Sequence, residues 1–343
     1  MTTIPPCPAL LADRFNTLRY DPEREAVVLL DRRVYPFRTE FVVCRTVEET
    51  AKAIEQMVVQ GGPPLAYAAG LGLALAEPTA AGYRQAAARL LATRPTADDL
   101  HHLIPAALAQ ALMALEAGAN PQQAVLAWVN AEIERGNRVS RACGEHAAAL
   151  LRDGDRILTH CFAGAALCWM LWIAKHQGKT VHLYATETRP YLQGARLTAQ
   201  AAVEMGIRCT VITDGMPAYL MSRGMIDRFI CAADRITRDG HITNKVGTFA
   251  IALAAHHHGV PFFVLGYDGA DPNTPSAEDI PIEWRDGREV LYLAGQRIAV
   301  EGVDALYPAF DITPPHLIAG IVTDRGVFPA HLIGMCGGND SGR

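Results

Sequence analysis

Residues 156–190, RILTHCFAGAALCWMLWIAKHQGKTVHLYATETRP, place two short apolar runs on either side of a helical stretch. The runs cover residues 156–160 and 180–185, and the helical stretch covers 164–177. The alternation continues with apolar runs at 209–213, 228–233 and 260–266 and helical stretches near 194–206, 216–223 and 246–258. Near-continuous apolar strands separated by helices are typical of a parallel sheet covered on both faces. We therefore predict a doubly wound parallel α/β domain over residues 152–343.

The first part of the chain has a helical period. After a short opening with β character, we expect helices at about 47–59, 65–76, 81–92, 97–117 and 121–151. Thr46 and Glu49 form a capping-box pattern ahead of the first helix, and the run 61–64, Gly-Gly-Pro-Pro, is expected to end it. These patterns predict a mainly helical domain over residues 1–138, with a connecting helix that extends to about 151.

Composition narrows the class of ligand. The 343 residues carry 31 Lys and Arg against 36 Asp and Glu, a net charge of −5 without a basic run, which argues against nucleic-acid binding. No apolar stretch is long enough to cross a membrane, and the N-terminus lacks the pattern of a signal peptide, so we expect a cytoplasmic protein. The eight cysteines contain no C-x-x-C pair and are expected to be free thiols. Small anionic ligands remain compatible with this composition.

Chemically active side chains follow four successive predicted strands. Cys161 follows the first, Glu187 the second, Asp214 the third and Asp234 the fourth. In doubly wound sheets, ligands bind beyond the carboxyl ends of the strands, where loops lead into helices. The sequence therefore predicts that a thiol and three carboxylates lie along one edge of the sheet.

Each of these residues also has a purely structural interpretation. Cys161 either packs in the core or reacts, with the following helix start expected to lower the pKa of its thiol, whereas Cys168 is expected in the core. Glu187 and Asp214 either cap helices or join the site. Asp234 precedes the turn-like segment RITRDGHIT and not a helix, so helix capping explains it less well. It is therefore the better candidate for acid–base chemistry.

Two segments have the features of anion-binding sites. The run Asn244-Lys245-Val246-Gly247-Thr248 is expected to open a helix, where it either binds an anion such as phosphate or simply caps the helix. The Gly61-Gly62 turn before a helix is similarly either a ligand loop or an ordinary connection. Three adjacent histidines at 256–258 cannot converge on one ion from a helix, so we predict no metal site.

Several motifs together resemble the methylthioribose-1-phosphate isomerase family, which is similar to the regulatory subunits of translation initiation factor 2B and to ribose-1,5-bisphosphate isomerase. The resemblance extends over nearly the whole chain, from Leu30 to Asp324. It rests on five segments: Thr159-His160-Cys161 with Ala163-Gly164-Ala165, Glu187-Thr188-Arg189-Pro190 with Gln193-Gly194-Ala195-Arg196-Leu197-Thr198, Ala233-Asp234-Arg235, Asn244–Thr248, and Pro308-Ala309-Phe310-Asp311-Ile312-Thr313-Pro314.

The resemblance implies a helical N-terminal domain, a Rossmann-like catalytic domain, a homodimer and a small phosphorylated sugar as substrate, without a cofactor or metal. It implies that Cys161 and Asp234 are the catalytic pair. The positions implied to bind the substrate or its phosphate are Gly61, Gly62, Arg94, Gln193, Asn244 and Lys245.

Two positions depart from the family pattern. Gln60 stands where the family has an arginine that binds phosphate, and Phe162 stands where it has an asparagine directly after the catalytic cysteine. The leading hypothesis is an aldose–ketose isomerase acting on S-methyl-5-thioribose 1-phosphate. The alternatives are an isomerase of another pentose derivative and a non-catalytic sensing subunit like the initiation-factor relatives; retention of both Cys161 and Asp234 favours an enzyme.

Overall fold

The structure is a computed structural model, and it describes residues 4–95 and 97–336. The chain divides into two compact units. One unit, which we call the helical unit, is formed by Asp13–Arg138. The other, which we call the sheet unit, is formed by the chain up to Ala12 and from Val139 onward. The helix that contains the division is α5 (Pro121–Ala149).

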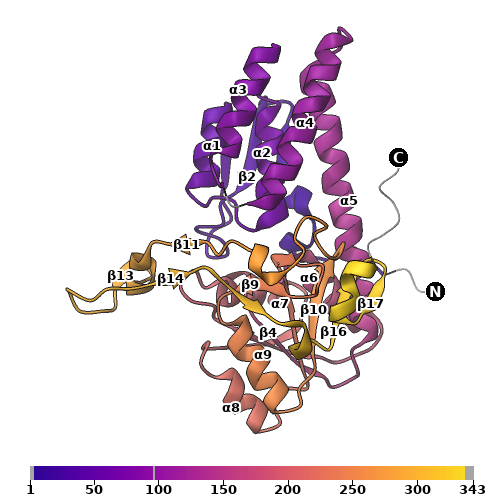
Figure 1. Ribbon diagram of the computed structural model, residues 1–343, viewed down its shortest axis with the longest axis vertical. Helices are drawn as coiled ribbons and strands as arrows, with labels where there is room; N and C mark the ends of the chain where they lie inside the picture. Colours follow the sequence, from indigo (N-terminus) through magenta and orange to yellow (C-terminus); the bar gives the residue numbers. More distant parts are fainter. Residues whose placement is uncertain (1–3, 96, 337–343) are drawn as a thin grey trace. The chain divides into compact units, whose positions relative to one another are not determined.

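The helical unit combines a small antiparallel sheet with helices (Figure 1). Its strands are β1 (Leu18–Asp21), β2 (Ala26–Leu30) and β3 (Phe41–Cys44). Its helices are α1 (Val47–Glu55), α2 (Gly62–Leu73), α3 (Ala80–Leu91), α4 (Asp98–Glu116) and the first part of α5. The apolar faces of these helices and of the sheet share one core, which includes Leu29, Ile54 and Leu71.

The Gly-Gly-Pro-Pro run begins a helix instead of ending one. Helix α1 starts as predicted, with the Thr46 hydroxyl accepting from the Glu49 N–H at 3.1 Å. It ends at Glu55 because Met57 takes a left-handed conformation (φ 61°) and the Val58 N–H closes the helix end on the Ala53 carbonyl at 2.9 Å. The glycine pair and the prolines that follow it therefore form the start of α2.

The sheet unit is built on a seven-stranded sheet with the order β17-β16-β10-β7-β4-β5-β6. The five predicted strands are present as β4 (Arg156–Thr159), β5 (His182–Thr186), β6 (Arg208–Ile212), β7 (Arg228–Ala232) and β10 (Phe262–Tyr267), all mutually parallel. The sequence analysis missed β16 (Gly320–Thr323), which extends the parallel sheet, and β17 (Gly326–Phe328), which is antiparallel to β16. The sheet confirms the predicted α/β class.

Helices cover both faces of this sheet (Figure 1). Ile157 and Leu183 pack in one core with α6 (Gly164–His176) and α7 (Ala199–Glu204). A π-helical segment, Gly194–Thr198, directly precedes α7. Leu158 and Tyr184, one residue further along the same strands, pack in a separate core with α8 (Pro217–Ser222) and α9 (Thr248–His257). Because successive strand residues point to opposite faces, this alternation is the packing of a doubly wound domain.

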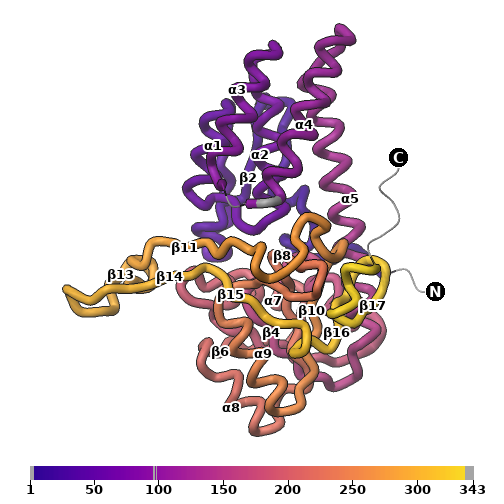
Figure 2. The backbone as a smooth tube through the Cα atoms, in the orientation of Figure 1, coloured from indigo at the N-terminus to yellow at the C-terminus, as the bar shows by residue number. Residues whose placement is uncertain are grey.

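Two further groups of strands were not predicted. A three-stranded antiparallel sheet contains β8 (Arg235–Ile236), β9 (Ile242–Lys245) and β15 (Phe310–Thr313), so the segment after Asp234 is a hairpin and not merely a turn. Residues 284–308 form an arm that runs outward from the sheet unit (Figure 2). The arm carries β11 (Trp284–Arg285), β12 (Tyr292–Leu293), β13 (Gln296–Arg297) and β14 (Tyr307–Pro308).

The remaining short helical segments are Leu10–Ala12, Arg14–Asn16, Ala277–Asp279, Gly287–Leu291, Pro315–Leu317 and Ala330–Met335. Across the described ranges, no helix combines the length and the apolarity needed to cross a membrane.

Gly70 is needed for the close packing of α2. A Cβ at this position would lie 2.6 Å from a Leu103 methyl group on α4 and 2.9 Å from a Val129 methyl group on α5. We expect Gly70→Ala to lower the free energy of unfolding by about 1–3 kcal/mol through overpacking. Urea unfolding followed by circular dichroism measures the change. Gly215→Ala, where the added Cβ meets no atom within 4 Å, is the matched control, and equal losses in the two variants would contradict the packing argument.

Candidate active site at the carboxyl edge of the sheet

The strand order of the parallel sheet reverses between β4 and β7. The chain passes from β4 outward to β5 and β6, then returns to the other side of β4 and continues through β7, β10 and β16. Ligands of doubly wound sheets bind at this kind of reversal. Cys161 lies two residues beyond the end of β4, and Asp234 lies two residues beyond the end of the neighbouring β7. The structure therefore places both predicted residues at the reversal.

The Asp234 side chain is exposed to solvent, and charged side chains of the protein lie near its carboxyl. Its backbone N–H donates to the Thr243 carbonyl at 2.8 Å, which fixes the start of the β8–β9 hairpin. The protein atoms around it raise the pKa of the Asp234 carboxyl, an effect that the Lys245 ammonium opposes and Glu283 reinforces. The site thus favours the protonated acid more than bulk water does, although the side chain reaches solvent.

Cys161 is a half-buried thiol on a backbone in the left-handed conformation (φ 62°). Burial raises the pKa of the Cys161 thiol to about 11, and the opposing effects of Lys245 and the Phe162 backbone are smaller. The expectation that the helix start lowers this pKa is wrong, because α6 begins only at Gly164 and the loss of solvent dominates. The thiol is therefore protonated at neutral pH.

A chain of hydrogen bonds links the Cys161 backbone to two other strand ends. The Cys161 N–H donates to the Thr188 hydroxyl at 2.9 Å, and the Thr188 and Thr186 hydroxyls lie 3.2 Å apart. The Thr186 hydroxyl lies 2.7 Å from Nδ1 of His160, whose Nε2 lies 3.0 Å from the Val246 carbonyl. A carbonyl only accepts, so Nε2 carries the proton and Thr186 donates to Nδ1. Burial lowers the pKa of His160, which is consistent with this neutral ring.

Of the other two carboxylates, Asp214 has a structural role. Its two oxygens accept the backbone N–H groups of Thr188 at 2.8 Å and Arg189 at 2.7 Å. It therefore caps the loop after β5 and not the helix that follows it in sequence. Glu187 lies half-buried at the same edge of the sheet. Cys168 is buried in the core beneath α6, as predicted.

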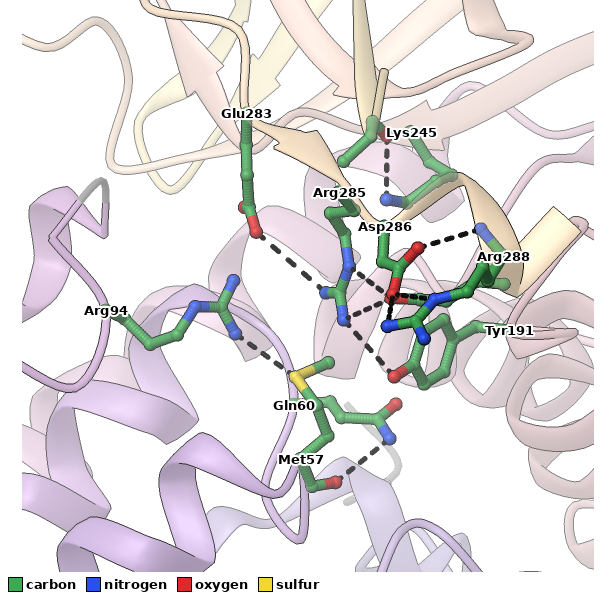
Figure 3. A network of polar contacts seen from close by, with 11 residues as sticks. Met57, Gln60, Arg94, Tyr191, Lys245, Glu283, Arg285, Asp286 and Arg288 are labelled. Carbon is green, nitrogen blue, oxygen red and sulfur yellow. Dashed lines mark hydrogen bonds and ion pairs between the residues drawn. The ribbon is translucent and has the colours of Figure 1, made fainter. Parts of the chain in front are cut away.

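Asn244 and Lys245 lie in strand β9, so the expectation that they open a helix is wrong. Both are buried, and the Asn244 amide donates to the Thr248 hydroxyl at 3.0 Å. The Lys245 ammonium donates to the Ala309 carbonyl at 2.7 Å and lies 4.4 Å from the centre of the Phe310 ring (Figure 3). Burial lowers the pKa of Lys245, while Cys161 and Asp234 raise it, which places the ammonium in the electrostatic neighbourhood of both candidate catalytic residues.

The N-terminus of α9 is already occupied by a carboxylate of the protein. Asp311 accepts from the Gly247 N–H at 2.7 Å and from the Phe249 N–H at 3.2 Å. The helix after the 244–248 segment is therefore capped, with the capping group supplied from β15. An anion near Lys245 would have to be held by side chains instead of by this helix end.

Gln193 immediately precedes the π-helical segment after β5. Its Oε1 is buried and has no hydrogen-bond partner within residues 4–95 and 97–336. Buried polar atoms are normally satisfied, so an acceptor of this kind is a candidate ligand for a hydroxyl group.

The sequence analysis overlooked a basic and aromatic cluster at the base of the arm. The Arg285 guanidinium donates to the Tyr191 hydroxyl at 3.2 Å and to Glu289 at 3.2 Å (Figure 3). It also lies 5.9 Å from the centre of the Tyr307 ring, and the Lys245 ammonium lies 5.6 Å from the centre of that ring. Arg285 and Tyr307 come from segments without a recognisable motif, so only their tertiary placement identifies them.

The remaining predicted positions belong to the helical unit. Gly61 and Gly62 form the start of α2, and the Arg94 guanidinium contacts the Met57 sulfur at 3.1 Å (Figure 3). The sequence analysis missed Arg32, which is buried and donates to the Gln60 carbonyl at 2.7 Å; burial lowers the pKa of Arg32 to about 10. Arg32 thus places a guanidinium at the loop that lacks an arginine at position 60.

The side chains at the two positions that depart from the family pattern, Gln60 and Phe162, both contact other groups of the protein. The Gln60 amide donates to the Met57 carbonyl at 3.2 Å, and the ring of Phe162 packs against the core beneath α6.

Within the part of the chain that the structure describes, no three His, Cys, Asp or Glu side chains gather as a metal site would require.

Comparison with known proteins assigns the chain to a family. A family model described as "Initiation factor 2 subunit family" matches residues 74–330, most of the chain. The chain belongs to this family. The match confirms the kinship with initiation factor 2B that the motifs indicated.

The relatives of the chain in this family include enzymes. Methylthioribose-1-phosphate isomerase of Anaeromyxobacter dehalogenans is 42% identical to it over 92% of this chain and 95% of the relative. The protein of that name from Thermus thermophilus is 38% identical over the same shares. The predicted resemblance to the methylthioribose-1-phosphate isomerase family is thereby confirmed.

Solved structures of the initiation factor 2 subunit family have the same fold. The 5-methylthioribose 1-phosphate isomerase of Pyrococcus horikoshii superposes with a TM-score of 0.80 at 34% identity, covering 93% of this chain and 94% of that chain. The initiation factor eIF-2B delta subunit of A. fulgidus superposes with a TM-score of 0.78, also at 34% identity, covering 91% and 95%. Fold similarity alone therefore does not separate an enzyme from a translation factor.

The Asp311 cap makes the stability of the protein depend on pH. Burial raises the pKa of this carboxyl from 3.8 to about 6, although the Gly247 and Phe249 N–H groups oppose the rise. Between those values the folded state binds more protons than the unfolded state, so stability falls as pH rises. Relative to Asp311→Asn, we expect the free energy of unfolding of the unmodified protein to fall from pH 4 to pH 6, by at most about 1.4 kcal/mol per pH unit. Urea unfolding at several pH values tests this, and parallel curves for the two proteins would contradict it.

Proposed function

We propose that the protein is an aldose–ketose isomerase that converts S-methyl-5-thioribose 1-phosphate to S-methyl-5-thioribulose 1-phosphate. The observation that carries the proposal is the placement of Cys161 and Asp234 at neighbouring strand ends, where the strand order reverses. The names of relatives that are 38–42% identical over most of the chain support the same reaction.

Asp234 is proposed as the acid that opens the sugar ring. An aldose 1-phosphate is a cyclic acetal, so the bond between C1 and the ring oxygen must break before C1 and C2 can exchange oxidation level. Breaking that bond leaves negative charge on the ring oxygen unless it receives a proton. A carboxyl whose pKa is raised by its surroundings supplies that proton more readily near neutral pH than an ordinary aspartate.

Cys161 is proposed to assist the movement of hydrogen between C2 and C1. It can do so as a base that removes the C2 proton and returns it to C1 through an enediol-like species, or as a proton donor beside a hydride shift from C2 to C1. In the hydride shift, the C2 hydroxyl passes its proton to the Asp234 carboxylate that ring opening leaves. With the pKa of its thiol raised to about 11, Cys161 is protonated at neutral pH, which supports the donor role. The nearby Lys245 ammonium favours negative charge at either acid while the hydrogen moves.

Groups that bind the substrate or its phosphate are proposed in each unit considered by itself. In the sheet unit these are Gln193, Asn244 and Lys245. In the helical unit they are Gly61, Gly62 and Arg94, with Arg32 beside the same loop. A guanidinium near the loop would compensate for the neutral side chain at position 60, because it offers charged donors that match a phosphate.

Two other functions are compatible with parts of this arrangement. An isomerase of another pentose derivative is motivated by Gln60 and Phe162, and a non-catalytic sugar-phosphate sensor by the similarity to the eIF-2B delta subunit. A sensor has no use for a thiol and an acidic carboxyl at one strand reversal, so we favour catalysis. The proposed location is the cytoplasm.

Turnover of the purified protein tests the proposal directly. Incubation with methylthioribose 1-phosphate, with ketose formation followed by NMR, should show conversion. Asp234→Asn and Cys161→Ser should each lower kcat by about 100-fold or more, because each removes a group that moves a proton or hydrogen in the reaction. Asp239→Asn, which changes an aspartate in the adjacent β8–β9 turn, serves as a matched control and should retain activity.

Three results would contradict parts of this proposal. Absence of turnover by the unmodified protein would exclude the leading substrate. Turnover that survives both Asp234→Asn and Cys161→Ser would exclude the proposed mechanism. Conversion of other pentose phosphates in preference to the methylthio sugar would favour the first alternative.

We also propose that the protein is a homodimer, with the arm of residues 284–308 at the interface. The arm exposes large apolar side chains, among them Val300 and Leu306, which are 75% and 77% exposed, and clustered apolar surface of this kind marks interaction sites. Light scattering coupled to size exclusion should give a dimer mass, and Val300→Asp with Leu306→Asp should give a monomer. Val203→Asp, at an exposed position on α7, is the control; a dimer that persists in the arm variant would place the interface elsewhere.

A further inference from the structure

The backbone at Cys161 is held in an unusual conformation from two sides. Cys161 and Thr188 both have positive φ values, 62° and 63°, in a region that residues with a β-carbon seldom adopt. The Cys161 N–H donates to the Thr188 hydroxyl at 2.9 Å. On the other side, the Thr198 hydroxyl donates to the Cys161 carbonyl at 2.7 Å. Both polar groups of the Cys161 peptide backbone are thus held by threonines of the loop after β5.

Thr188 is itself fixed by its surroundings. Its backbone N–H donates to the Asp214 carboxylate. Its hydroxyl forms a second hydrogen bond, with the Thr186 hydroxyl. Gly194 lies against the same loop so closely that a Cβ there would be 2.9 Å from the Thr188 hydroxyl and would overlap the Thr186 carbonyl. Only glycine at position 194 therefore leaves the loop in place, and rotation of the loop away from Asp214 would break a buried hydrogen bond.

We propose that Thr188, anchored by Asp214 and Gly194, is a positioning residue that holds the Cys161 thiol toward the reacting carbon atoms. Cys161 lies two residues beyond the end of β4, where an ordinary extended or helical backbone would direct its side chain elsewhere. The left-handed conformation sets the direction of the Cα–Cβ bond, and the hydrogen bonds from Thr188 and Thr198 maintain it. This inference rests on the proposed role of Cys161 in the isomerase reaction.

The arrangement explains why a hydroxyl is needed at position 188. The Thr188 oxygen accepts from Cys161 while its hydrogen is directed to Thr186, so it joins the Cys161 backbone to the Thr186–His160 pair. Valine has the same shape but can neither accept nor donate. Serine keeps both functions and loses only a methyl group.

The variants Thr188→Val and Thr188→Ser test the proposal. We expect Thr188→Val to lower kcat at least about 10-fold while KM changes by less than about 2-fold, because displacement of a reacting group costs rate more than binding. Thr188→Ser should restore most of kcat. Thr50→Val is the matched control: Thr50 is fully buried and its hydroxyl bonds to the Thr46 carbonyl within α1, so its loss should leave kcat unchanged.

A second measurement needs no substrate. Alkylation by iodoacetamide, followed at the Cys161 peptide by mass spectrometry, reports how the thiol is presented. We expect Thr188→Val to change this rate by at least about 3-fold, since thiol reactivity follows exposure and local environment, with Thr188→Ser and Thr50→Val near the unmodified rate. If the unmodified protein does not convert methylthioribose 1-phosphate, the proposed function fails, and the alkylation rates still decide the positioning role.

Unchanged kcat and unchanged alkylation in folded Thr188→Val would overturn the inference. So would a serine variant as impaired as the valine variant, because the hydroxyl would then be irrelevant. If circular dichroism shows that Thr188→Val does not fold, Thr198→Val takes its place, since it removes the other hydrogen bond to the Cys161 backbone. The same falls in kcat and changes in alkylation are expected there, and their absence would overturn the inference equally.

Discussion

The reversal of strand order between β4 and β7 is the constraint on which the rest of the site depends. All the parallel strands end at one edge of the sheet, but at the reversal the following segments lead to opposite faces. β4 continues into α6 on one face, and β7 continues through the β8–β9 hairpin to α9 on the other. Residues just beyond these two strands therefore lie at neighbouring strand ends, without an intervening crossover. The thiol and the carboxyl occupy those positions, and the hairpin brings Lys245 back into their electrostatic neighbourhood.

Burial has coordinated effects on the charges at this edge. It raises the pKa of Cys161 and lowers that of Lys245, and the protein atoms around the solvent-exposed Asp234 carboxyl raise its pKa as well. The ammonium and the two acids each oppose the shift in the other. The result is a protonated thiol and a carboxyl with a raised pKa beside a lysine side chain. These groups suit a reaction in which negative charge develops on a substrate oxygen. They already lie near that position, so they stabilise the charge without reorganising.

Much of the fold followed from the sequence because apolar periodicity is local. The five long parallel strands and their helices are visible in runs of consecutive residues. The β8–β9 hairpin is not, since its first strand has two residues, although the Asp239-Gly240 pair is a recognised hairpin turn signal. The early end of α1 depends on a left-handed Met57, a residue without the usual preference for that conformation.

The candidate site was partly predictable for a related reason. Strand ends can be located from sequence, so Cys161 and Asp234 were found. The pKa shifts of their side chains could not be derived, because the protein surroundings of each group result from the packing of distant segments. Arg32 escaped notice because the loop it contacts lies 28 residues away. Asp311 was part of a recognised motif, but its capping role was missed because the helix it caps lies more than 60 residues away. Asp214 had the expected location but binds a loop that precedes it in the chain.

At neutral pH, the Asp311 carboxylate matches the positive end of α9 from within the chain. A tethered carboxylate competes with dissolved anions at a high effective concentration, so this end is closed to the phosphate, sulfate or nucleotide groups that free helix ends attract. At this end of α9, attraction for anions is therefore left to the surrounding side chains. Side chains, unlike a helix dipole, can be arranged around one particular molecule, so internal neutralisation of the helix serves selectivity among the many phosphorylated compounds of a cell.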